Sequence, residues 1–260
     1  MSQQTTSPIE AGFIAGTLGH TNDGLKPIEL LRIGDCVLSK PEFSESSAVP
    51  SYKRVTNTFR FERKWVATLA WFQRSDEDPP NSRARRYDEV FVAPDQLVWV
   101  DRYGWLPVKR LHEPTKMHWH LLAFEDYECS LFRLADGSAC RIGNVMDCFC
   151  TNQEGVVYAD YGDRPLEEGF LWDVKVSPPQ KLPNSFVGFD MDEWLVQPAD
   201  EPYCFTTTVF NIEVEEFRTY YIGESGLWVH DGSINRAPVV PPSRFSVGIF
   251  PPDDSWPKFD

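Results

Sequence analysis

The stretch that decides the fold lies near the start of the chain and reads GFIAGTLGHTNDGLKPIELLRIGDCVLS over residues 12–39. Small and apolar residues at 13–17 predict a short strand, and the Asp-Gly pair that follows predicts a tight turn. Pro27 precedes apolar residues at helical spacing, which predicts a single helical turn. A Gly-Asp pair then ends this turn, and a further strand is expected to begin at Cys36.

Short segments between turn signals continue along the chain. Residues 54–61 and 66–72 are rich in valine, threonine and aromatic residues, as strands are. Residues 88–111 predict three strands separated by two turns, whereas residues 40–52 are typical of a loop. Because no stretch shows sustained helical spacing, the sequence predicts a mostly β fold.

Length and charge limit the classes of function. The 260 residues are 42% hydrophobic and 14% aromatic, which is a globular composition long enough for one substantial core. The formal net charge of −14 argues against a nucleic acid or an anionic membrane as partner. Acidity of this size serves solubility, or it favours association with a protein that has a basic surface.

The chain shows no targeting or membrane signal. Its first residues, MSQQTTSP, are polar, and no apolar run approaches the ~18 residues that a membrane span requires. Six cysteines spread over this length do not form the pattern of a disulfide framework. We therefore expect a cytoplasmic protein in a reducing environment.

The opening stretch resembles the first block of Hint domains, the hedgehog/intein self-processing fold, and most closely those of bacterial polymorphic toxins. That block begins with a Cys, followed by Phe-x-Ala-Gly-Thr, a Thr-x-x-Gly turn, an Ile-containing segment and Gly-Asp-x-Val. The matching residues are Phe13, Ala15, Gly16, Thr17, Thr21, Gly24, Ile28, Gly34, Asp35 and Val37. Gly12 stands where the family has its nucleophilic Cys.

Two later segments resemble the remaining Hint blocks. Residues 92–105 keep the spacing of the second block, but Ala93 and Gln96 replace its Thr and His. Residues 208–231 resemble the third block, in which Arg218 replaces the first His. The residues of the third block that match are Val209, Asn211, Glu213, Val214, Thr219, Tyr220, Gly223, Val229 and His230, and Asp231 replaces the terminal Asn.

The resemblance implies a domain organisation. We expect a pseudo-symmetric Hint-type β domain over residues 12–231, with an enlarged middle insertion at about 113–203. The insertion lacks the paired acidic helices of a homing endonuclease, so it is interpreted as a private elaboration and a candidate binding surface. A polar tail at residues 1–11 and a Pro-rich, acidic tail at 232–260 flank the domain.

The replaced positions predict a loss of self-processing. Hint chemistry needs a thiol or hydroxyl at its first position, and Gly12 has no side chain. Ala93 and Gln96 cannot titrate near neutrality, and Arg218 stays protonated. Asp231 carries a carboxylate where an amide nitrogen must close a succinimide. His230 alone keeps the family residue, so we expect no catalytic residues at these six positions.

Two functional hypotheses follow from the resemblance. The first is a catalytically inactive, protein-binding Hint-like protein, such as an immunity or accessory protein that recognises a polymorphic toxin with a basic surface. The alternative is an autoprocessing domain with residual or altered peptide-bond cleavage near His230-Asp231. The Asp-Gly pair is reactive, since such backbones isomerise through a succinimide, and His230 is adjacent. A scaffold within a larger assembly is a third, less specific possibility.

Histidine and cysteine pairs raise the question of a metal site. His118 and His120 share one strand face, a spacing that metals can use, and His112 and Glu113 lie nearby in the sequence. Residues 148–150, Cys-Phe-Cys, have one intervening residue where zinc thiolate pairs have two or more. We interpret the histidines as exposed and the cysteines as buried or in loops, and predict no metal and no cofactor.

The remaining candidate functional residues are two acidic pairs and one aromatic residue in the C-terminal tail. Glu167-Glu168 and Asp253-Asp254 have no recognisable nucleophile or His beside them and are interpreted as solvated faces. Trp256, in the C-terminal tail, is a candidate anchor for a protein partner.

Overall fold

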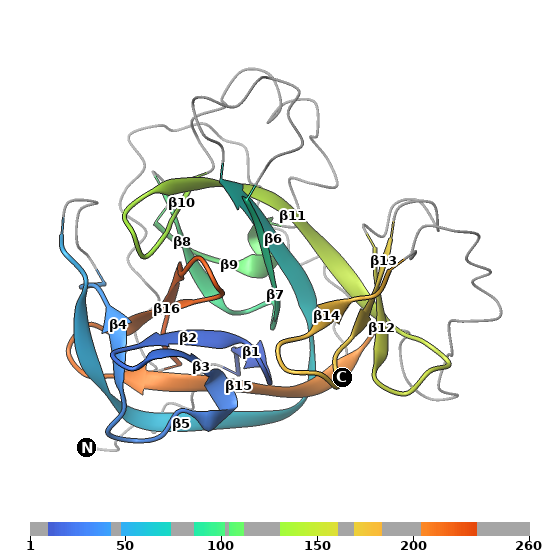
Figure 1. The fold of residues 1–260 in the computed structure, drawn as a ribbon, viewed down its shortest axis with the longest axis horizontal. Coiled ribbons are helices and arrows are strands. Elements are labelled where there is room, and N and C mark those ends of the chain that lie inside the picture. Colours follow the sequence, from blue (N-terminus) through green and yellow to red (C-terminus); the bar gives the residue numbers. More distant parts are fainter. Residues whose placement is uncertain are drawn as a thin grey trace, which may run out of the picture.

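The computed structural model is mostly β, as the sequence predicts (Figure 1). It describes residues 10–42, 48–73, 86–101, 104–111, 131–160, 169–183 and 204–232. Its strands join by continuous pairing into one highly curved sheet system. None of the helical segments in these ranges is long and apolar enough to cross a membrane.

The strands of the first half are β1 (Phe13–Ile14), β2 (Leu18–Thr21), β3 (Gly24–Pro27), β4 (Cys36–Ser39), β5 (Ser51–Trp65), β6 (Ala67–Gln73), β7 (Arg86–Val92), β8 (Leu97–Val100) and β9 (Gly104–Pro107). A short 3-10 helix, η1 (Ile28–Leu30), lies between β3 and β4. The strands of the second half are β10 (Leu131–Arg133), β11 (Ala139–Cys150), β12 (Val156–Asp160), β13 (Phe170–Asp173), β14 (Gln180–Lys181), β15 (Thr206–Val214), β16 (Thr219–Ile222) and β17 (Leu227–His230).

The opening stretch forms the predicted turn, helical turn and strand, but its first strand is shorter than expected. β2 and β3 form a tight hairpin in which the hydroxyl of Thr21 donates to the carbonyl of Gly24 at 2.6 Å. The strand predicted over residues 13–17 ends at Ile14. The chain turns there because the N–H of Gly16 donates to the carboxylate of Glu29 at 2.8 Å, instead of continuing a strand ladder.

The later strand predictions are confirmed with two changes. β5 begins at Ser51, within the segment predicted as a loop, and β7, β8 and β9 occupy the 88–111 segment. Residues 108–111 form a helical turn instead of extending the third strand. The backbone N–H groups of Val108 and Lys109 are bonded to the turn at residues 94–96, each at 2.9 Å, so they are not available to a ladder partner.

The three segments that resemble Hint blocks pair directly with one another. β1 of the first block pairs with both β15 and β7, and β2 pairs with β16. β17 of the third block pairs with β8 of the second block. This pairing places the start of residues 12–39 beside the start of residues 208–231, and the end of residues 208–231 beside the second block.

The described part of the 113–203 region continues the same sheet. β11 runs antiparallel to β6 from Arg141 opposite Phe72 to Asp147 opposite Ala67. β12, β13 and β14 lie beyond one end of β11, to the side of the main body in Figure 1. That these residues form an insertion into a Hint domain stays a prediction.

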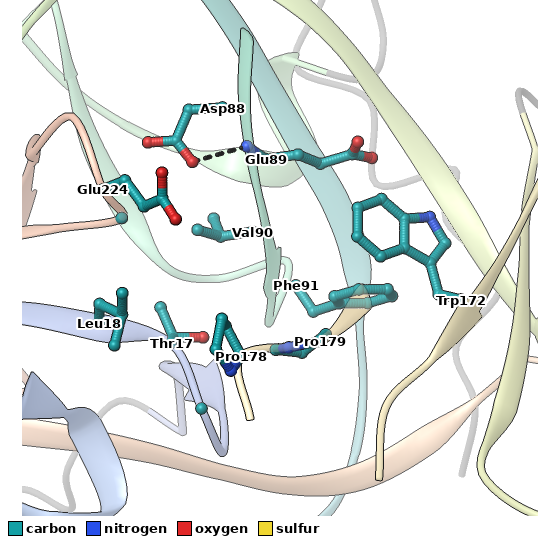
Figure 2. Close-up of a pocket in the computed structure, with 12 residues that line it drawn as sticks. Thr17, Leu18, Asp88, Glu89, Val90, Phe91, Trp172, Pro178, Pro179 and Glu224 are labelled. Carbon is teal, nitrogen blue, oxygen red and sulfur yellow. Dashed lines mark hydrogen bonds between the residues drawn. The ribbon is translucent and has the colours of Figure 1, made fainter. Parts of the chain in front are cut away.

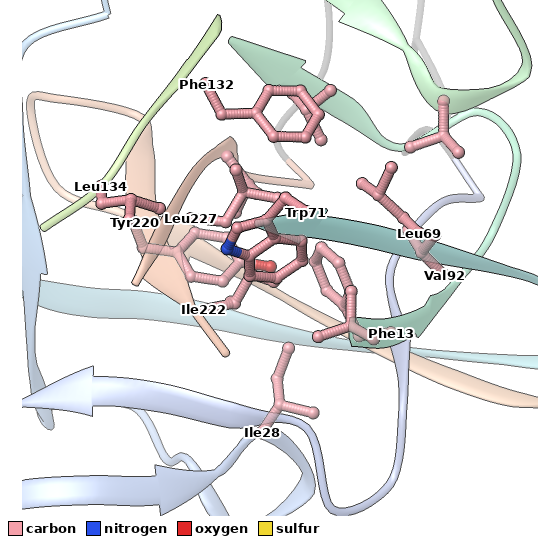
Figure 3. Packing of buried hydrophobic residues seen from close by; sticks show 14 of the residues in the cluster. Phe13, Ile28, Leu69, Trp71, Val92, Phe132, Leu134, Tyr220, Ile222 and Leu227 are labelled. Carbon is pink, nitrogen blue, oxygen red and sulfur yellow. The ribbon is translucent and has the colours of Figure 1, made fainter. Parts of the chain in front are cut away.

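The main core draws on every block (Figure 3). It includes Phe13 from the first block, Val92 from the second, Tyr220 from the third and Phe132 from β10, all nearly inaccessible to solvent. Trp71 on β6 packs edge-on against Phe132, with ring centroids 6.4 Å apart. The strands of the middle region are therefore held to the body by shared packing as well as by pairing.

Candidate functional site

Gly12 lies just before β1, where its backbone passes very close to β15. Its φ angle of 145° is in the region that favours glycine. A Cβ atom added to Gly12 would lie 2.2 Å from the carbonyl oxygen of Phe210 and 3.3 Å from the Cβ atom of Asn211. A cysteine or serine therefore fits only if β1 or β15 moves. The carbonyl of Gly12 also accepts a hydrogen bond of 2.8 Å from the N–H of Ala93.

Gln96, at the predicted His position, has its amide fully engaged. The side chain is buried, and its Nε2 donates to the carbonyl oxygens of His230 at 2.8 Å and Leu97 at 3.1 Å. Its Oε1 accepts from Nδ2 of Asn211 at 3.0 Å. Because both donors and the acceptor of its amide have partners inside the protein, the Gln96 side chain is held in one orientation.

Asn211 links the Gln96 side chain to the N-terminal end of the described body. Besides Gln96, its Nδ2 bonds the carbonyl oxygen of Ala11 at 3.2 Å. Its Oδ1 accepts from the N–H of Ile212 at 2.8 Å and from the hydroxyl of Tyr220 at 2.9 Å. Burial raises the pKa of Tyr220 well above its ordinary value, so the hydroxyl stays a donor. Asn211 thus holds the carbonyl at which the resemblance places the first acyl shift.

His230 lies on β17 between two acceptors. Its Nε2 is 2.9 Å from a carboxylate oxygen of Glu42, and its Nδ1 is 2.9 Å from the carbonyl oxygen of Asp231. Both ring nitrogens must donate to such partners, which requires the protonated ring. Burial opposes this charge, but the hydrogen bonds to Glu42 and Asp231 and their negative charges outweigh it and raise the pKa of His230. A protonated imidazole cannot accept a proton, so this geometry disfavours a role as a base.

The Asp231-Gly232 junction is tied to β15 on both sides of its peptide bond. A carboxylate oxygen of Asp231 accepts from the N–H of Val214 at 2.8 Å. The N–H of Gly232 donates to the carbonyl of Ile212 at 2.8 Å. Attack of this nitrogen on the side-chain carboxyl carbon of Asp231 would give a succinimide, which isomerises the backbone without cutting it. Cleavage instead needs a carboxylate oxygen of Asp231 to attack the backbone carbonyl carbon of the same residue, with the Gly232 nitrogen leaving as the amine. In both reactions the groups involved would have to break the hydrogen bonds described here.

The structure brings five of the six predicted positions together. They form one chain of hydrogen bonds, from the Gly12 carbonyl through the backbone of Ala93 to Gln96, His230 and Asp231. The side chain of Arg218 is exposed in the turn between β15 and β16, and only its carbonyl joins the site, by accepting from the N–H of Asp231 at 2.9 Å.

Three further residues of the site were not predicted. Asn211 and Tyr220 match the third block in sequence, but the pattern gives them no role in holding the junction. Glu42 follows β4 and reaches His230 across 188 positions of sequence, so no local pattern could identify it. Its backbone carbonyl also accepts from the indole N–H of Trp105 at 3.1 Å.

The other sequence candidates are separate from this site. Cys148 is buried on β11, and Cys150 lies half-buried with its Sγ 3.9 Å from the carbonyl oxygen of Cys204. Within the described ranges, no three His, Cys, Asp or Glu residues are grouped as a metal site. The candidates that fall outside the described residues are His112, Glu113, His118, His120, Glu167, Glu168, Asp253, Asp254 and Trp256.

No protein-family model matches the sequence, and no curated protein matches it. The solved structures that resemble the chain include inteins and an intein-like domain. A bacterial intein-like domain from Clostridium thermocellum is 17% identical, with 85% of this chain and 99% of that chain covered and a TM-score of 0.43. A DnaB intein from Synechocystis sp. PCC 6803 is 10% identical, with 86% and 99% covered and a TM-score of 0.44. The gp41-1 intein is 13% identical, with 85% and 98% covered and a TM-score of 0.41. Similarity this low leaves the chemistry of the site to be interpreted from its own residues.

Proposed function

We propose that the chain is a Hint-type domain, of the kind found in bacterial polymorphic toxins, that has lost self-processing and serves as a protein-binding module. Support comes from the convergence of its three Hint-like blocks. They are distant in sequence, yet they meet at the two peptide junctions where Hint chemistry would act, Ala11-Gly12 and Asp231-Gly232. A chain that keeps this arrangement without the reactive groups retains a scaffold and not a catalyst.

The observation that carries the proposed inactivity is the contact between Gly12 and β15. Self-processing begins when a side chain at this position attacks the preceding carbonyl, and here there is no such side chain. The space that its Cβ atom would occupy is taken by the carbonyl of Phe210 at 2.2 Å. The loss therefore involves the backbone path as well as the residue type.

Cleavage near His230-Asp231 is the alternative, and one observation favours it. The protonated ring of His230 lies against the carbonyl of Asp231 and would polarise it. Against it, the Asp231 carboxylate, which would have to attack the backbone carbonyl carbon of the same residue, is held by the N–H of Val214, and the leaving nitrogen of Gly232 is held by the carbonyl of Ile212. We therefore rank this reaction below inactivity.

The intact mass of the purified protein tests the choice between these two. The chain should stay at 29.9 kDa through days at neutral pH, with and without an added thiol. Loss of the segment after Asp231, prevented in a His230→Ala variant, would instead establish processing at that junction. Release of the first eleven residues by thiol would contradict the role given to Gly12.

For binding, we propose a protein partner with a basic surface, because the chain carries a net charge of −14. In the context of polymorphic toxins this is a cytoplasmic immunity or accessory protein that recognises a toxin. Affinity capture from the organism that encodes the chain should recover one specific protein that elutes with salt. An unrelated acidic protein of equal net charge is the control for simple ion exchange. If both baits recover the same proteins, specific binding is refuted.

A further inference from the structure

The turn between β13 and β14 packs against the body and borders a cavity of about 230 Å³ that is open to solvent (Figure 2). Trp172, Pro178 and Pro179 contribute the wall from the middle region. Asp88 and Phe91 on β7 contribute the lining from the body, together with Glu224 in the turn after β16, and Phe91 lies next to Trp172. The cavity exists only because the 113–203 region packs against the Hint-like part.

The walls of this cavity combine aromatic rings with fixed negative charge. Phe91 and Trp172 pack edge to face with ring centroids 5.3 Å apart. Asp88 and Glu224 lie across from Trp172 in Figure 2. The Asp88 carboxylate is held in place by the N–H and the hydroxyl of Ser225, at 2.9 and 2.7 Å. Glu224 is exposed at the rim.

Neither Asp88 nor Glu224 forms an ion pair with a residue in the described part of the chain. The nearby His20 adds no compensating charge near neutrality, because burial lowers its pKa. Among the described residues, the negative charges of Asp88 and Glu224 are therefore not neutralised by an ion pair, although both side chains line the same cavity as the Trp172 ring. A positively charged group placed there would gain from both features.

The Trp172 ring already has one cation beside it. The ammonium of Lys181 lies 3.6 Å from the ring centroid of Phe170 and 4.9 Å from that of Trp172. It also pairs with the Glu89 carboxylate at 3.3 Å. An aromatic ring and a carboxylate thus jointly hold a basic side chain within this protein, which is the chemistry that the cavity offers to an external one.

We propose that this cavity receives a single arginine side chain of a protein partner. This inference rests on the proposed binding function, and it specifies where on the protein the partner would make contact. Ligand pockets for drug-sized molecules measure ~300–1,000 Å³, so a cavity of about 230 Å³ suits one side chain better than a whole ligand. Arginine is favoured over lysine because its planar group stacks on aromatic rings and offers several donors to carboxylates.

The direct test is an NMR titration of the tryptophan indole N–H signals, with the Trp172 signal assigned from a Trp172→Phe variant. The probes are the blocked amino acids Nα-acetyl-arginine amide, the lysine analogue, and the citrulline analogue, which keeps the shape of arginine without its charge. We expect a saturable shift of the Trp172 signal with arginine at millimolar concentrations, a weaker one with lysine and none with citrulline. Equal shifts with citrulline, or no saturation with arginine, would overturn the inference.

Charge substitutions locate the binding. Glu224→Gln should weaken arginine binding by about threefold, because it removes one exposed carboxylate at the rim. Glu215→Gln, at an exposed carboxylate in a different turn, should leave the affinity unchanged. An equal effect of the two substitutions would show that arginine responds to the overall charge and not to this cavity.

The inference and the proposed function can fail separately. If a specific partner is captured equally by the unmodified chain and by Glu224→Gln, and arginine does not bind, the cavity is not the contact point but the binding function stands. If arginine binds at the cavity and no specific partner is captured, the site stands and the binding function falls.

Discussion

Restoring a cysteine at Gly12 should damage the fold without restoring chemistry. In Gly12→Cys the new Cβ atom would start 2.2 Å from the carbonyl oxygen of Phe210, on a backbone whose φ angle is 145°. The thiol can be accommodated only by separating β1 from β15. That movement would also shift the Ala11 carbonyl away from Asn211, so the nucleophile and its target would not be aligned.

The size of the effect follows from two costs. A non-glycine residue in such a backbone region costs about 1–3 kcal/mol. Relief of an overpacked contact costs about 1–3 kcal/mol more. A central total of about 4 kcal/mol would lower the melting temperature by about 8–16 °C for a chain of this size.

Gly24→Cys separates the two costs in a calorimetric melting experiment. Gly24 has a φ angle of 105°, but a Cβ atom added there meets nothing within 4 Å. Gly24→Cys therefore carries the cost of the unfavourable φ angle but not that of the steric overlap. The melting temperature of Gly12→Cys should be clearly lower than that of Gly24→Cys. If the two variants melt within about 2 °C of each other, or if Gly12→Cys releases its N-terminal segment with thiol, the reasoning about β15 is wrong.

Two further predictions concern the hydrogen bonds of the site. Gln96→Ala should lower the free energy of unfolding, measured by urea denaturation, by about 2–3 kcal/mol, because it leaves buried polar groups of Asn211 and His230 without this hydrogen-bond partner. The control Gln180→Ala, at an exposed position, should change the free energy of unfolding by less than about 0.5 kcal/mol. The raised pKa of His230 stabilises the fold fully below its unfolded-state value of about 6.5, and this contribution is lost as the pH rises through the folded-state pKa. Melting temperatures measured between about pH 5 and pH 9 should show this loss in the parent and not in His230→Gln, and an unchanged slope in the variant would assign the effect to another group.

The local elements of this fold could be predicted because neighbouring residues determine them. Valine-, threonine- and aromatic-rich segments became β5 and β6, and the Asp-Gly pair formed the β2–β3 turn. The errors occurred where a distant partner takes over a backbone group. β1 ends early because Glu29 reaches back to Gly16, and residues 108–111 turn helical because they bond to residues 94–96.

The candidate site could be predicted in composition but not in geometry. The sequence alone indicates that Gly12 offers no nucleophile. It cannot show that the backbone of Phe210 fills the vacant space, because that depends on how β1 pairs with β15. The carboxylate of Glu42 beside His230 and the cavity beside Trp172 likewise depend on contacts across long stretches of chain.

The two ends of the described body meet at a single side chain, and this has a consequence for how the domain can be carried. Asn211 bonds the carbonyl of Ala11, and a Cβ atom on Gly232 would lie 3.1 Å from its Cγ atom. Chain entry and chain exit are therefore neighbours, so the whole body can be accommodated within a surface loop of another protein with little separation of that loop's ends. For the same reason, a short linker between these ends, with new termini opened at the exposed Asn22-Asp23 turn, gives a circularly permuted chain in which every strand pairing described above is geometrically possible.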